Sequence, residues 1–258
     1  MKFSILISSY NKGNYLEDCL NSCLNQSYKN YEIILIDNYS NDNTKHILKK
    51  FSKKIKILKK KKISTYPQMN QIDLLVKAFK ISKGSVICLL DADDLFNPNK
   101  LFYLKKLFKL KKKTDVIFDL ALIQKNGIKK KFKFKKKIQK YIWPTIVNTS
   151  SISMRRKFFQ KCLNEKIFNK FNLLEIDFRI TVLAISILKN YYITKENLTV
   201  YVYAKDGIMS KIKKYSKKWW IKRSQAHDFM KYIYLKHSKT YGNKIDLLSS
   251  RILSKFTI

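Results

Sequence analysis

The stretch that decides the fold of this chain is Val86-Ile87-Cys88-Leu89-Leu90-Asp91-Ala92-Asp93-Asp94. Its first five residues are continuously apolar, as in a parallel strand that is covered on both faces. Acidic residues follow at once, and a buried carboxylate without a partner is costly, so these acids must meet solvent, a cation or a hydrogen-bond donor. The stretch therefore predicts a central strand that delivers carboxylates to one edge of a sheet.

Short apolar runs alternate with amphipathic segments on both sides of this stretch, which predicts an open, mostly parallel α/β sheet flanked by helices. Asn14 and Glu17 resemble a capping box at the start of the first helix, and Asn97-Pro98 is typical of the start of the fourth. The expected strands are residues 3–9, 31–37, 55–58 and 86–90, and the expected helices are residues 14–26, 43–51, 68–82 and a segment from 97 onward.

The alternation weakens from residue 115. Asn126-Gly127 predicts a hairpin turn between a strand at 115–123 and a Lys-rich strand at 129–137. That second strand is interpreted as an edge strand protected by lysines or as a patch that binds polyanions. Further helices are expected at 155–163 and 175–188, strands at 191–193 and 198–203, and helix from 216 onward.

Composition bounds the class of protein. Lys and Arg number 55 against 18 Asp and Glu, giving a formal net charge of +37, while 45% hydrophobic residues exclude a disordered chain. Nearly all the basic residues are Lys. That excess fits either compositional drift or attraction to anionic lipid or an anionic substrate. We expect no specific nucleic-acid partner because base recognition favours Arg.

The four cysteines form no CxxC pair, so we expect free thiols in a reducing compartment. The apolar stretches are too short for a signal peptide or a membrane-spanning helix. Together these features predict a cytoplasmic protein, with peripheral contact to the inner face of an anionic membrane as a further hypothesis.

Three polar motifs follow expected strands, at Ser8-Ser9-Tyr10-Asn11, Asp37-Asn38-Tyr39-Ser40 and Asp91-Ala92-Asp93. Ligands of open sheets bind outside the carboxyl ends of the strands, where these motifs would meet. On an extended chain Asp91 and Asp93 would point the same way, and paired carboxylates suit Mg²⁺ or Mn²⁺ with a diphosphate. The alternative is that the acids cap the helix expected at Pro98.

Three segments of the chain resemble family 2 glycosyltransferases of the GT-A fold: Ile7-Ser8-Ser9-Tyr10-Asn11, residues 24–37 and residues 82–94. The resemblance implies a GT-A-type, Rossmann-like domain over residues 1–210, with a nucleotide-binding half at 1–110 and an acceptor half at 111–210. Residues 211–258 would form a small, basic and aromatic helical C-terminal extension, in which Trp219-Trp220 contact either the domain or a bilayer.

The same resemblance implies an inverting enzyme that moves a sugar from a nucleotide-diphosphate donor to the hydroxyl of a glycan or lipid-linked acceptor, in surface polysaccharide or glycolipid synthesis. It assigns Asp91-Ala92-Asp93 to Mn²⁺ or Mg²⁺ and diphosphate, with Asp93 as the first choice of direct ligand. The nucleotide would be held by Ser8, Ser9, Tyr10, Asn11, Asp37 and Asn38.

Its catalytic base would be Glu175 as first choice and Asp177 as second, although acids at a helix start are also favoured by the helix dipole. Asn38 stands where relatives often have a second Asp, so a uridine donor stays open. Lys77 and Lys205 are either diphosphate contacts or solvated lysines.

Two other functions compete with glycosyl transfer. A sugar-phosphate nucleotidyltransferase would need a glycine-rich loop after the first strand, and residues 8–13 contain one glycine. A Lys-rich polyanion-binding protein would bind in a steeply salt-dependent way, but gives no reason for acids at the ends of strands.

Overall fold

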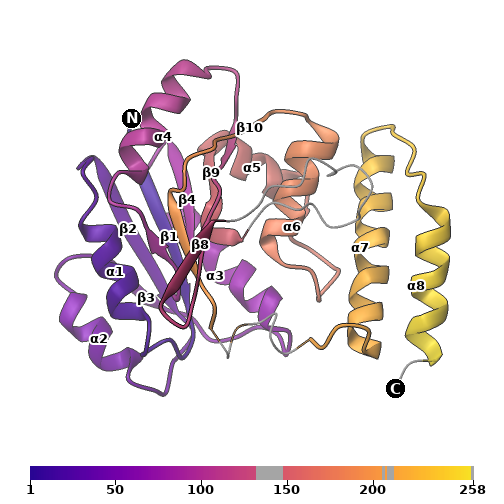
Figure 1. The fold of residues 1–258 in the computed structure, drawn as a ribbon, viewed down its shortest axis with the longest axis horizontal. Helices are drawn as coiled ribbons and strands as arrows, with labels where there is room; N and C mark the ends of the chain where they lie inside the picture. The colour runs from indigo at the N-terminus through magenta and orange to yellow at the C-terminus, as the bar shows by residue number, and fades with distance from the viewer. Residues whose placement is uncertain (132–147, 205–206, 208–211, 257–258) are drawn as a thin grey trace.

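The computed structural model describes residues 1–131, 148–204, 207 and 212–256. Its centre is an open seven-stranded sheet in the order β10-β6-β9-β4-β1-β2-β3 (Figure 1). The strands are β1 (Phe3–Ser9), β2 (Tyr31–Asp37), β3 (Lys56–Lys59), β4 (Val86–Asp91), β6 (Val116–Phe118), β9 (Ile152–Arg155) and β10 (Tyr191–Ile193).

Most of the sheet is parallel, as the sequence predicts. β1 pairs in parallel with β2 and β4, β2 with β3, and β6 with β10. The exception is β9, a strand that the sequence analysis did not expect, which runs antiparallel between β4 and β6. It is only four residues long, so its apolar pattern is too short to be recognised in the sequence.

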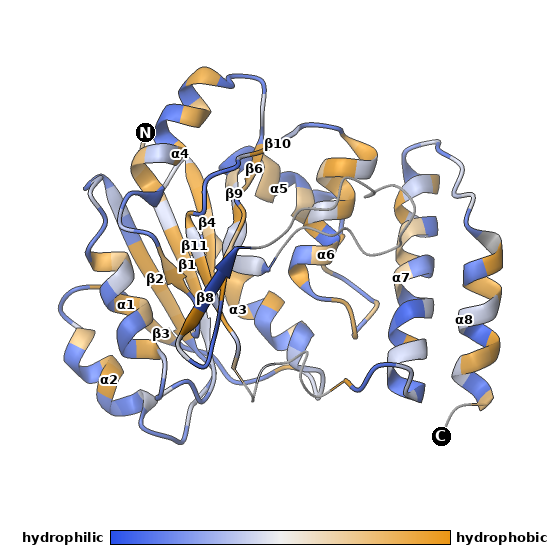
Figure 2. Cartoon of the chain, in the orientation of Figure 1, coloured by the Kyte–Doolittle hydropathy of each residue, from blue (hydrophilic) through white to orange (hydrophobic). Residues whose placement is uncertain are grey.

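Alternating residues of the central strands face two separate apolar cores. In β1, for example, Leu6 lies in one core and Ile5 and Ile7 lie in the other. The strands are apolar over most of their length (Figure 2), as expected for a sheet covered on both faces. One core contains α1 (Leu16–Leu24), α2 (Thr44–Phe51) and α4 (Lys100–Leu110); the other contains α3 (Pro67–Ile81), α5 (Arg156–Asn164), α6 (Ile176–Thr181) and α7 (Lys217–Lys236).

A second, four-stranded sheet has the order β5-β11-β7-β8, from β5 (Leu95–Phe96), β11 (Thr199–Val202), β7 (Leu122–Lys125) and β8 (Ile128–Lys131). The single strand expected at 115–123 is therefore wrong, because β6 and β7 belong to different sheets. The hairpin turn is confirmed, with φ of 50° at Asn126 and 77° at Gly127. β8 is an exposed edge strand, while the expected strand beyond Lys131 lies outside the described residues.

Two expected helix starts are wrong. Tyr15 occupies the cap position of α1 and Asn14 is exposed, so the capping box does not form. α4 begins at Lys100 because residues 95–96 pair with β11 and the Asn97 side chain accepts a hydrogen bond from the Asn99 amide. The helix expected at 175–188 is α6 followed by a π-helical turn, Val182–Ile187.

The C-terminal segment is a pair of helices. α7 is capped by the Ser216 hydroxyl, which accepts from the Trp219 amide. Its own Phe229 and Ile233 are buried in the core that also contains α3, α5 and α6. α8 (Lys244–Phe256) lies outside α7, at the edge of the molecule away from the sheet (Figure 1). None of the helices within the described residues is both long and apolar enough to span a bilayer.

Candidate functional site

The three polar motifs lie side by side at the carboxyl edge of the sheet. The β1–β2 pairing sets Ser9 opposite Asp37, and the β1–β4 pairing sets Ser8 opposite Asp91. Three segments far apart in the chain therefore reach one edge, where open sheets bind their ligands.

The first two motifs form one hydrogen-bonded loop pair. Asp37 is fully buried, and its carboxylate accepts from the Ser40 hydroxyl (2.6 Å) and the Ser40 amide (3.1 Å). Ser40 in turn accepts from the Asn11 amide at 2.8 Å. Asn11 and Tyr39 both have left-handed backbones, with φ of 49° and 55°. Such strain is often held at binding sites, and here the loops are fixed by their mutual hydrogen bonds.

The loop pair combines two exposed tyrosine rings with buried polar side chains. Tyr10 and Tyr39 are each 53% exposed, so their rings stand in solvent beside the loops. Within the described part of the chain, the buried Ser9 hydroxyl has no hydrogen-bond partner. Asn38 is buried and its side-chain amide donates to the Lys60 carbonyl at 2.7 Å.

Asp91 is positioned by hydrogen bonds with two uncharged side chains, those of Gln71 and Ser150. The Gln71 side chain donates to Asp91 Oδ1 at 2.6 Å, and the Asp91 amide donates to the Ser150 hydroxyl at 3.0 Å. Burial and the charge of Asp93 raise the pKa of Asp91 to about 7. Lys12 Nζ lies 2.8 Å from Asp93 Oδ2, so the first loop carries a cation to the acidic motif.

The prediction that Asp91 and Asp93 point the same way on an extended chain is wrong. The chain does not stay extended after β4: it turns at residues 92–93, and the Asp94 amide donates to the Asp91 carbonyl at 3.0 Å. The two carboxylates nevertheless interact, because the turn keeps them at the same edge.

Asp94 has a structural role and does not cap a helix. It is fully buried, and its carboxylate accepts from the Ser150 hydroxyl, the Asn148 side chain and the Val202 amide, at 2.6, 2.8 and 2.9 Å. It thereby fastens β11 of the second sheet to the edge of the first. The capping interpretation of the acids is wrong, since α4 begins at Lys100 with Asn99 in the cap position.

The two acids predicted as the catalytic base, Glu175 and Asp177, stand at the start of α6. Glu175 Oε1 accepts from Lys222 Nζ of α7 at 2.6 Å, and Lys222 is only 3% exposed. The pKa of Asp177 is raised to about 7 by burial, with further contributions from the charges of Glu175 and Asp91. Asp177 is therefore within electrostatic range of the motif at the end of β4.

Tyr201 of β11 lies among the same carboxylates. Burial raises its pKa to about 12, and the charges of Asp94, Asp93, Asp91 and Asp177 add to the shift. The sequence analysis did not identify Tyr201, Lys12, Gln71 or Lys222 as site residues. Of these, only Lys12 adjoins a motif; the others come from elements whose approach to the edge depends on the tertiary fold.

The structure places the two predicted lysines differently. Lys77 is exposed on α3, six residues after Gln71, whereas Gln71 is the α3 residue that reaches Asp91. Lys205 lies outside the described residues.

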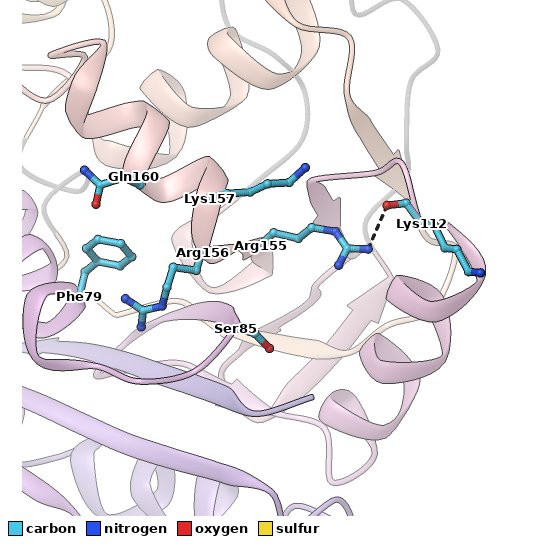
Figure 3. Close-up of a pocket in the computed structure, with 7 residues that line it drawn as sticks. All are labelled: Phe79, Ser85, Lys112, Arg155, Arg156, Lys157 and Gln160. Carbon is cyan, nitrogen blue, oxygen red and sulfur yellow. Dashed lines mark hydrogen bonds between the residues drawn. The ribbon is translucent and has the colours of Figure 1, made fainter.

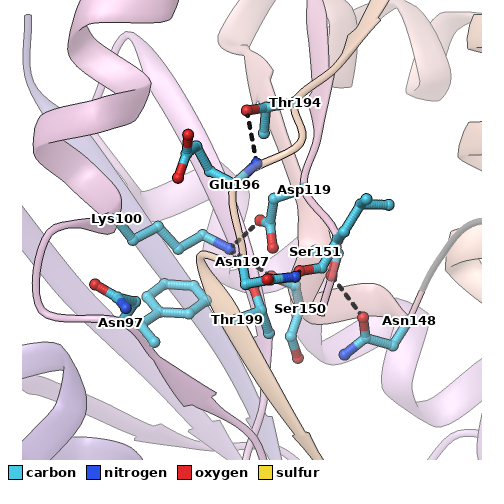
Figure 4. Close-up of polar contacts among 12 residues, drawn as sticks. Asn97, Lys100, Asp119, Asn148, Ser150, Ser151, Thr194, Glu196, Asn197 and Thr199 are labelled. Atoms are coloured by element: carbon cyan, nitrogen blue, oxygen red, sulfur yellow. Dashed lines mark hydrogen bonds and ion pairs between the residues drawn. The ribbon is translucent and has the colours of Figure 1, made fainter. Parts of the chain in front are cut away.

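A buried lysine lies at the centre of a second polar cluster (Figure 4). Lys100 is fully buried, and its Nζ donates to Asp119 (2.7 Å), the Ser150 carbonyl (2.8 Å) and the Thr199 hydroxyl (2.7 Å). Its partners come from both sheets and from the turn before β9, so this cluster joins them. The sequence analysis missed it because lysine is rarely buried without a dedicated partner.

A basic cavity of about 640 Å³ lies at the opposite end of β4, beside Ser85 (Figure 3). Its arginines are largely committed to the backbone. Arg155 donates to the carbonyls of Phe108, Lys112 and Thr114, and Arg156 donates to the Gly84 carbonyl and the Ser82 hydroxyl. We place the candidate site at the carboxyl edge, because the acids and the exposed Tyr10 and Tyr39 rings are there.

The family 2 glycosyl transferase model matches residues 4–163, more than half of the chain. The chain belongs to glycosyl transferase family 2. Among curated relatives, an uncharacterized glycosyltransferase of Nostoc sp. is 31% identical over 128 residues, which are 49% of this chain and 38% of that protein. The putative teichuronic acid biosynthesis glycosyltransferase TuaG of Bacillus subtilis is 31% identical over 100 residues, 38% of each chain. The chain thus spans well under half of these relatives.

Solved structures confirm the GT-A fold of this family 2 protein. Residues 1–349 of S. aureus TarS in complex with UDP-GlcNAc give a TM-score of 0.65 at 15% identity, covering 98% of this chain and 70% of that one. The mannosyltransferase PcManGT of Pyrobaculum calidifontis, in complex with GDP-Man and Mn²⁺, gives 0.58 at 13% identity, covering 99% and 70%. The family and fold expected from the sequence are both confirmed.

Proposed function

We propose that this family 2 protein is an inverting glycosyltransferase that uses a nucleotide-diphosphate sugar. The observation that carries the proposal is the meeting of the Ser8–Ser9 and Asp37 loops, the Asp91–Asp93 motif and Asp177 at one edge of the sheet. That edge supplies what the reaction needs: a polar loop for the nucleotide, acids for a cation and a separate acid for the acceptor proton.

The nucleotide would bind over the first two loops. The exposed Tyr10 and Tyr39 rings provide faces on which a base can stack. Asp37 contributes mainly by holding this loop pair, since both of its oxygens accept from Ser40. Asn38 retains its side-chain oxygen for the base while its amide nitrogen is bound to Lys60.

The residues at the end of β4 fit a divalent cation. Asp91 and Asp93 offer hard carboxylate oxygens, the donors preferred by Mg²⁺ and Mn²⁺. The pKa of Asp91 is raised by burial and then by the charge of Asp93, and a cation would offset both. The described residues contain no cluster of three or more His, Cys, Asp or Glu side chains placed for a metal, so phosphate oxygens and water would complete the shell. The bound ion would stabilise the charge on the departing diphosphate.

We propose Asp177 rather than Glu175 as the base. A general base works best with a pKa near the operating pH, and the pKa of Asp177 is about 7. Glu175 is engaged by Lys222 at 2.6 Å, so its carboxylate is held in the ion pair. Asp177 would accept the proton of the acceptor hydroxyl while that oxygen attacks the anomeric carbon.

We place the reaction in surface polysaccharide or glycolipid synthesis. Support comes from the similarity to the Bacillus relative TuaG, which is named for teichuronic acid biosynthesis. The acceptor would then be a glycan or a lipid-linked sugar.

The test begins with binding. Thermal unfolding and calorimetry would be measured with UDP, GDP and the other nucleoside diphosphates, with and without Mn²⁺, for the wild type and for Asp93→Asn. We expect one nucleotide to stabilise the wild type, to require the cation, and to lose most of its affinity in Asp93→Asn. The matched control is Asp18→Asn, an exposed acid on α1.

Turnover then separates the reaction classes. The nucleotide that binds would be supplied as its sugar conjugate, and release of nucleoside diphosphate would be followed. Pyrophosphate release from a nucleoside triphosphate and a sugar phosphate would instead indicate a nucleotidyltransferase. Nucleotide binding that is equally tight without the cation and in Asp93→Asn would contradict the proposal.

A further inference from the structure

The outermost helix, α8, is apolar on its outward face. Ile245, Leu248, Ile252 and Phe256 are 84%, 61%, 47% and 79% exposed. Their spacing of three, four and four residues sets them along one side of a helix. Figure 2 shows apolar turns on α8 although the helix lies at the rim of the molecule. The outward face is thus a continuous hydrophobic stripe.

The less exposed side of α8 carries polar groups beside the half-buried Leu247 and Leu253. Asp246 is bound by the Arg223 guanidinium of α7, with Nε 3.0 Å from Oδ1, and its Oδ2 lies 3.2 Å from His227 Nε2. Ser250 is fully buried. This side of α8 is covered by α7, whereas the apolar stripe of the other side is left exposed, so the stripe is available to contact something other than this chain.

The stripe extends onto α7. Ile221, which is 37% exposed, lines one shallow groove of about 590 Å³ together with Leu248, Ile252 and Phe256. Basic side chains border it: Arg251 and Lys255 line the same groove, and Arg251 is paired with Asp228 at 2.7 Å. The result is an apolar strip beside positive charge.

The positive charge around the stripe indicates which kind of partner it can contact. Residues 213–256 contain 12 Lys and Arg against two Asp, and the whole chain carries +37. Both of those aspartates are bound by arginines of the same helix pair. A second copy of the chain would bring the same positive charge to the interface, which opposes association, whereas an anionic surface would be attracted.

We propose that the outward face of α8, with Ile221 of α7, lies on an anionic lipid bilayer. An amphipathic helix binds in the membrane plane by burying an apolar stripe at the headgroup boundary, while flanking Lys and Arg interact with anionic lipid. The inference goes beyond glycosyl transfer and does not depend on it.

The docking face is joined to the candidate site by consecutive residues of α7. Lys222 binds Glu175 at the start of α6, and Arg223 binds Asp246 of α8. A protein held through α8 would therefore keep its acidic edge at a fixed distance from the lipid surface. We assign the bilayer contact to α8 and not to Trp219-Trp220. Both tryptophans are half-buried, and their rings pack edge-to-face on each other with 4.6 Å between centroids.

The first experiment is flotation of the full chain with vesicles of phosphatidylcholine alone or mixed equally with phosphatidylglycerol. The test variant is Ile245→Ser/Leu248→Ser/Ile252→Ser. Its matched control is Ile63→Ser/Leu110→Ser, which changes side chains that are 61% and 75% exposed elsewhere. We expect the wild type and the control to float with the anionic vesicles, and the partition coefficient of the α8 variant to fall by roughly tenfold or more. Unfolding temperatures of all three proteins verify folding.

A second measurement locates the contact. The four native cysteines are buried, so a cysteine introduced by Ile252→Cys can be labelled selectively with an environment-sensitive fluorophore. We expect its emission to shift to the blue on anionic vesicles, and that of Leu110→Cys to stay unchanged.

Three outcomes would overturn the proposal. The wild type does not float with anionic vesicles; the α8 variant floats as well as the wild type; or the wild type is a dimer that dissociates in the α8 variant, which would assign the stripe to a second copy. None of these readouts uses catalysis, so they are distinguishable from failure of the proposed enzymatic function.

Discussion

Two clusters of charged side chains lie close together in this protein, and they differ in how their charges are balanced. Around Lys100 every strong interaction is made within the chain, since its ammonium group has an aspartate, a carbonyl and a hydroxyl as partners at 2.7–2.8 Å. At the edge formed by Asp91, Asp93 and Asp177, carboxylates face one another, and the pKa values of Asp91 and Asp177 are raised to about 7. Burial also raises the pKa of Asp119 and Asp94, so what distinguishes the edge from the Lys100 ion pair is that its carboxylates lie near one another.

The difference also shows in which elements supply the cations. Lys100 belongs to the helix that follows the acidic motif and is sealed between the two sheets. Lys12 and Lys222 come from the first loop and from α7, and each meets one acid at the edge. These two ion pairs offset part of the negative charge at the acidic edge and leave the rest for a ligand. Such a balance is typical of functional sites.

The largest effect is expected for Asp177→Asn. Removing the proposed base should lower turnover by about three orders of magnitude, within the range for general-base catalysis, and leave the unfolding temperature unchanged or higher because a buried charge is lost. Glu175→Gln should cost less, since Glu175 acts through its ion pair. Sugar transfer and thermal unfolding would both be measured, with Asp18→Asn as control. Equal losses in Asp177→Asn and Asp18→Asn would remove Asp177 from the mechanism.

Lys100→Met should instead lower the stability of the fold. It leaves Asp119 buried without its cation, and breaking such a pair costs about 3–5 kcal/mol of folding free energy. Replacing both partners, as Lys100→Met/Asp119→Leu, should recover much of that loss. Urea denaturation measures both, against Lys109→Met on the exposed side of the same helix. A single variant as stable as Lys109→Met would show that the cluster is not structural.

A smaller effect is expected for Gln71→Leu. Gln71 hydrogen-bonds to Asp91 and lowers its pKa, so its loss should favour the protonated carboxyl and weaken Mn²⁺ binding by roughly tenfold. The measurement is a Mn²⁺ titration followed by calorimetry in the presence of nucleotide. Gln160→Leu, on the rim of the basic cavity, is the matched control. Unchanged cation affinity would show that Gln71 only fills space.

The contrast between the two groups could be predicted from the sequence only in part. The strand-end motifs were recognisable because apolar strands, polar loops and acids occur in consecutive residues, and parallel pairing then brought Ser8, Asp37 and Asp91 together. The roles of Lys100 and Lys222 could not be predicted. A lysine in a helix has no local signal for burial, and each meets an acid whose position depends on packing between elements distant in the chain.

The four-residue β9 shows the same limit for the fold. It is inserted antiparallel between β4 and β6, and no periodicity is visible over so short a segment. The Asn126-Gly127 hairpin was predictable, in contrast, because its left-handed backbone requires those residue types locally.

The smallest expected effect is a shift in pH dependence caused by Lys222→Met. If Asp177 is the base, turnover rises with pH as its carboxyl ionises and levels off above about pH 7. The positive charge of Lys222 lowers the pKa of Asp177, so removing it should raise that pKa and move the rising limb to higher pH. We expect a shift of about half a unit, which is roughly a threefold lower rate on the acidic side and little change on the plateau.

The comparison variants make this last prediction specific. Lys222→Arg keeps the charge and should keep the wild-type profile, and Lys218→Met removes an exposed charge from the same helix and should leave the profile in place. A merely structural role for Lys222 would lower the rate at every pH without moving the limb. A limb that moves to lower pH would have the wrong sign for any carboxylate base beside this cation, and would contradict both Asp177 and Glu175, whose carboxylate Lys222 binds directly.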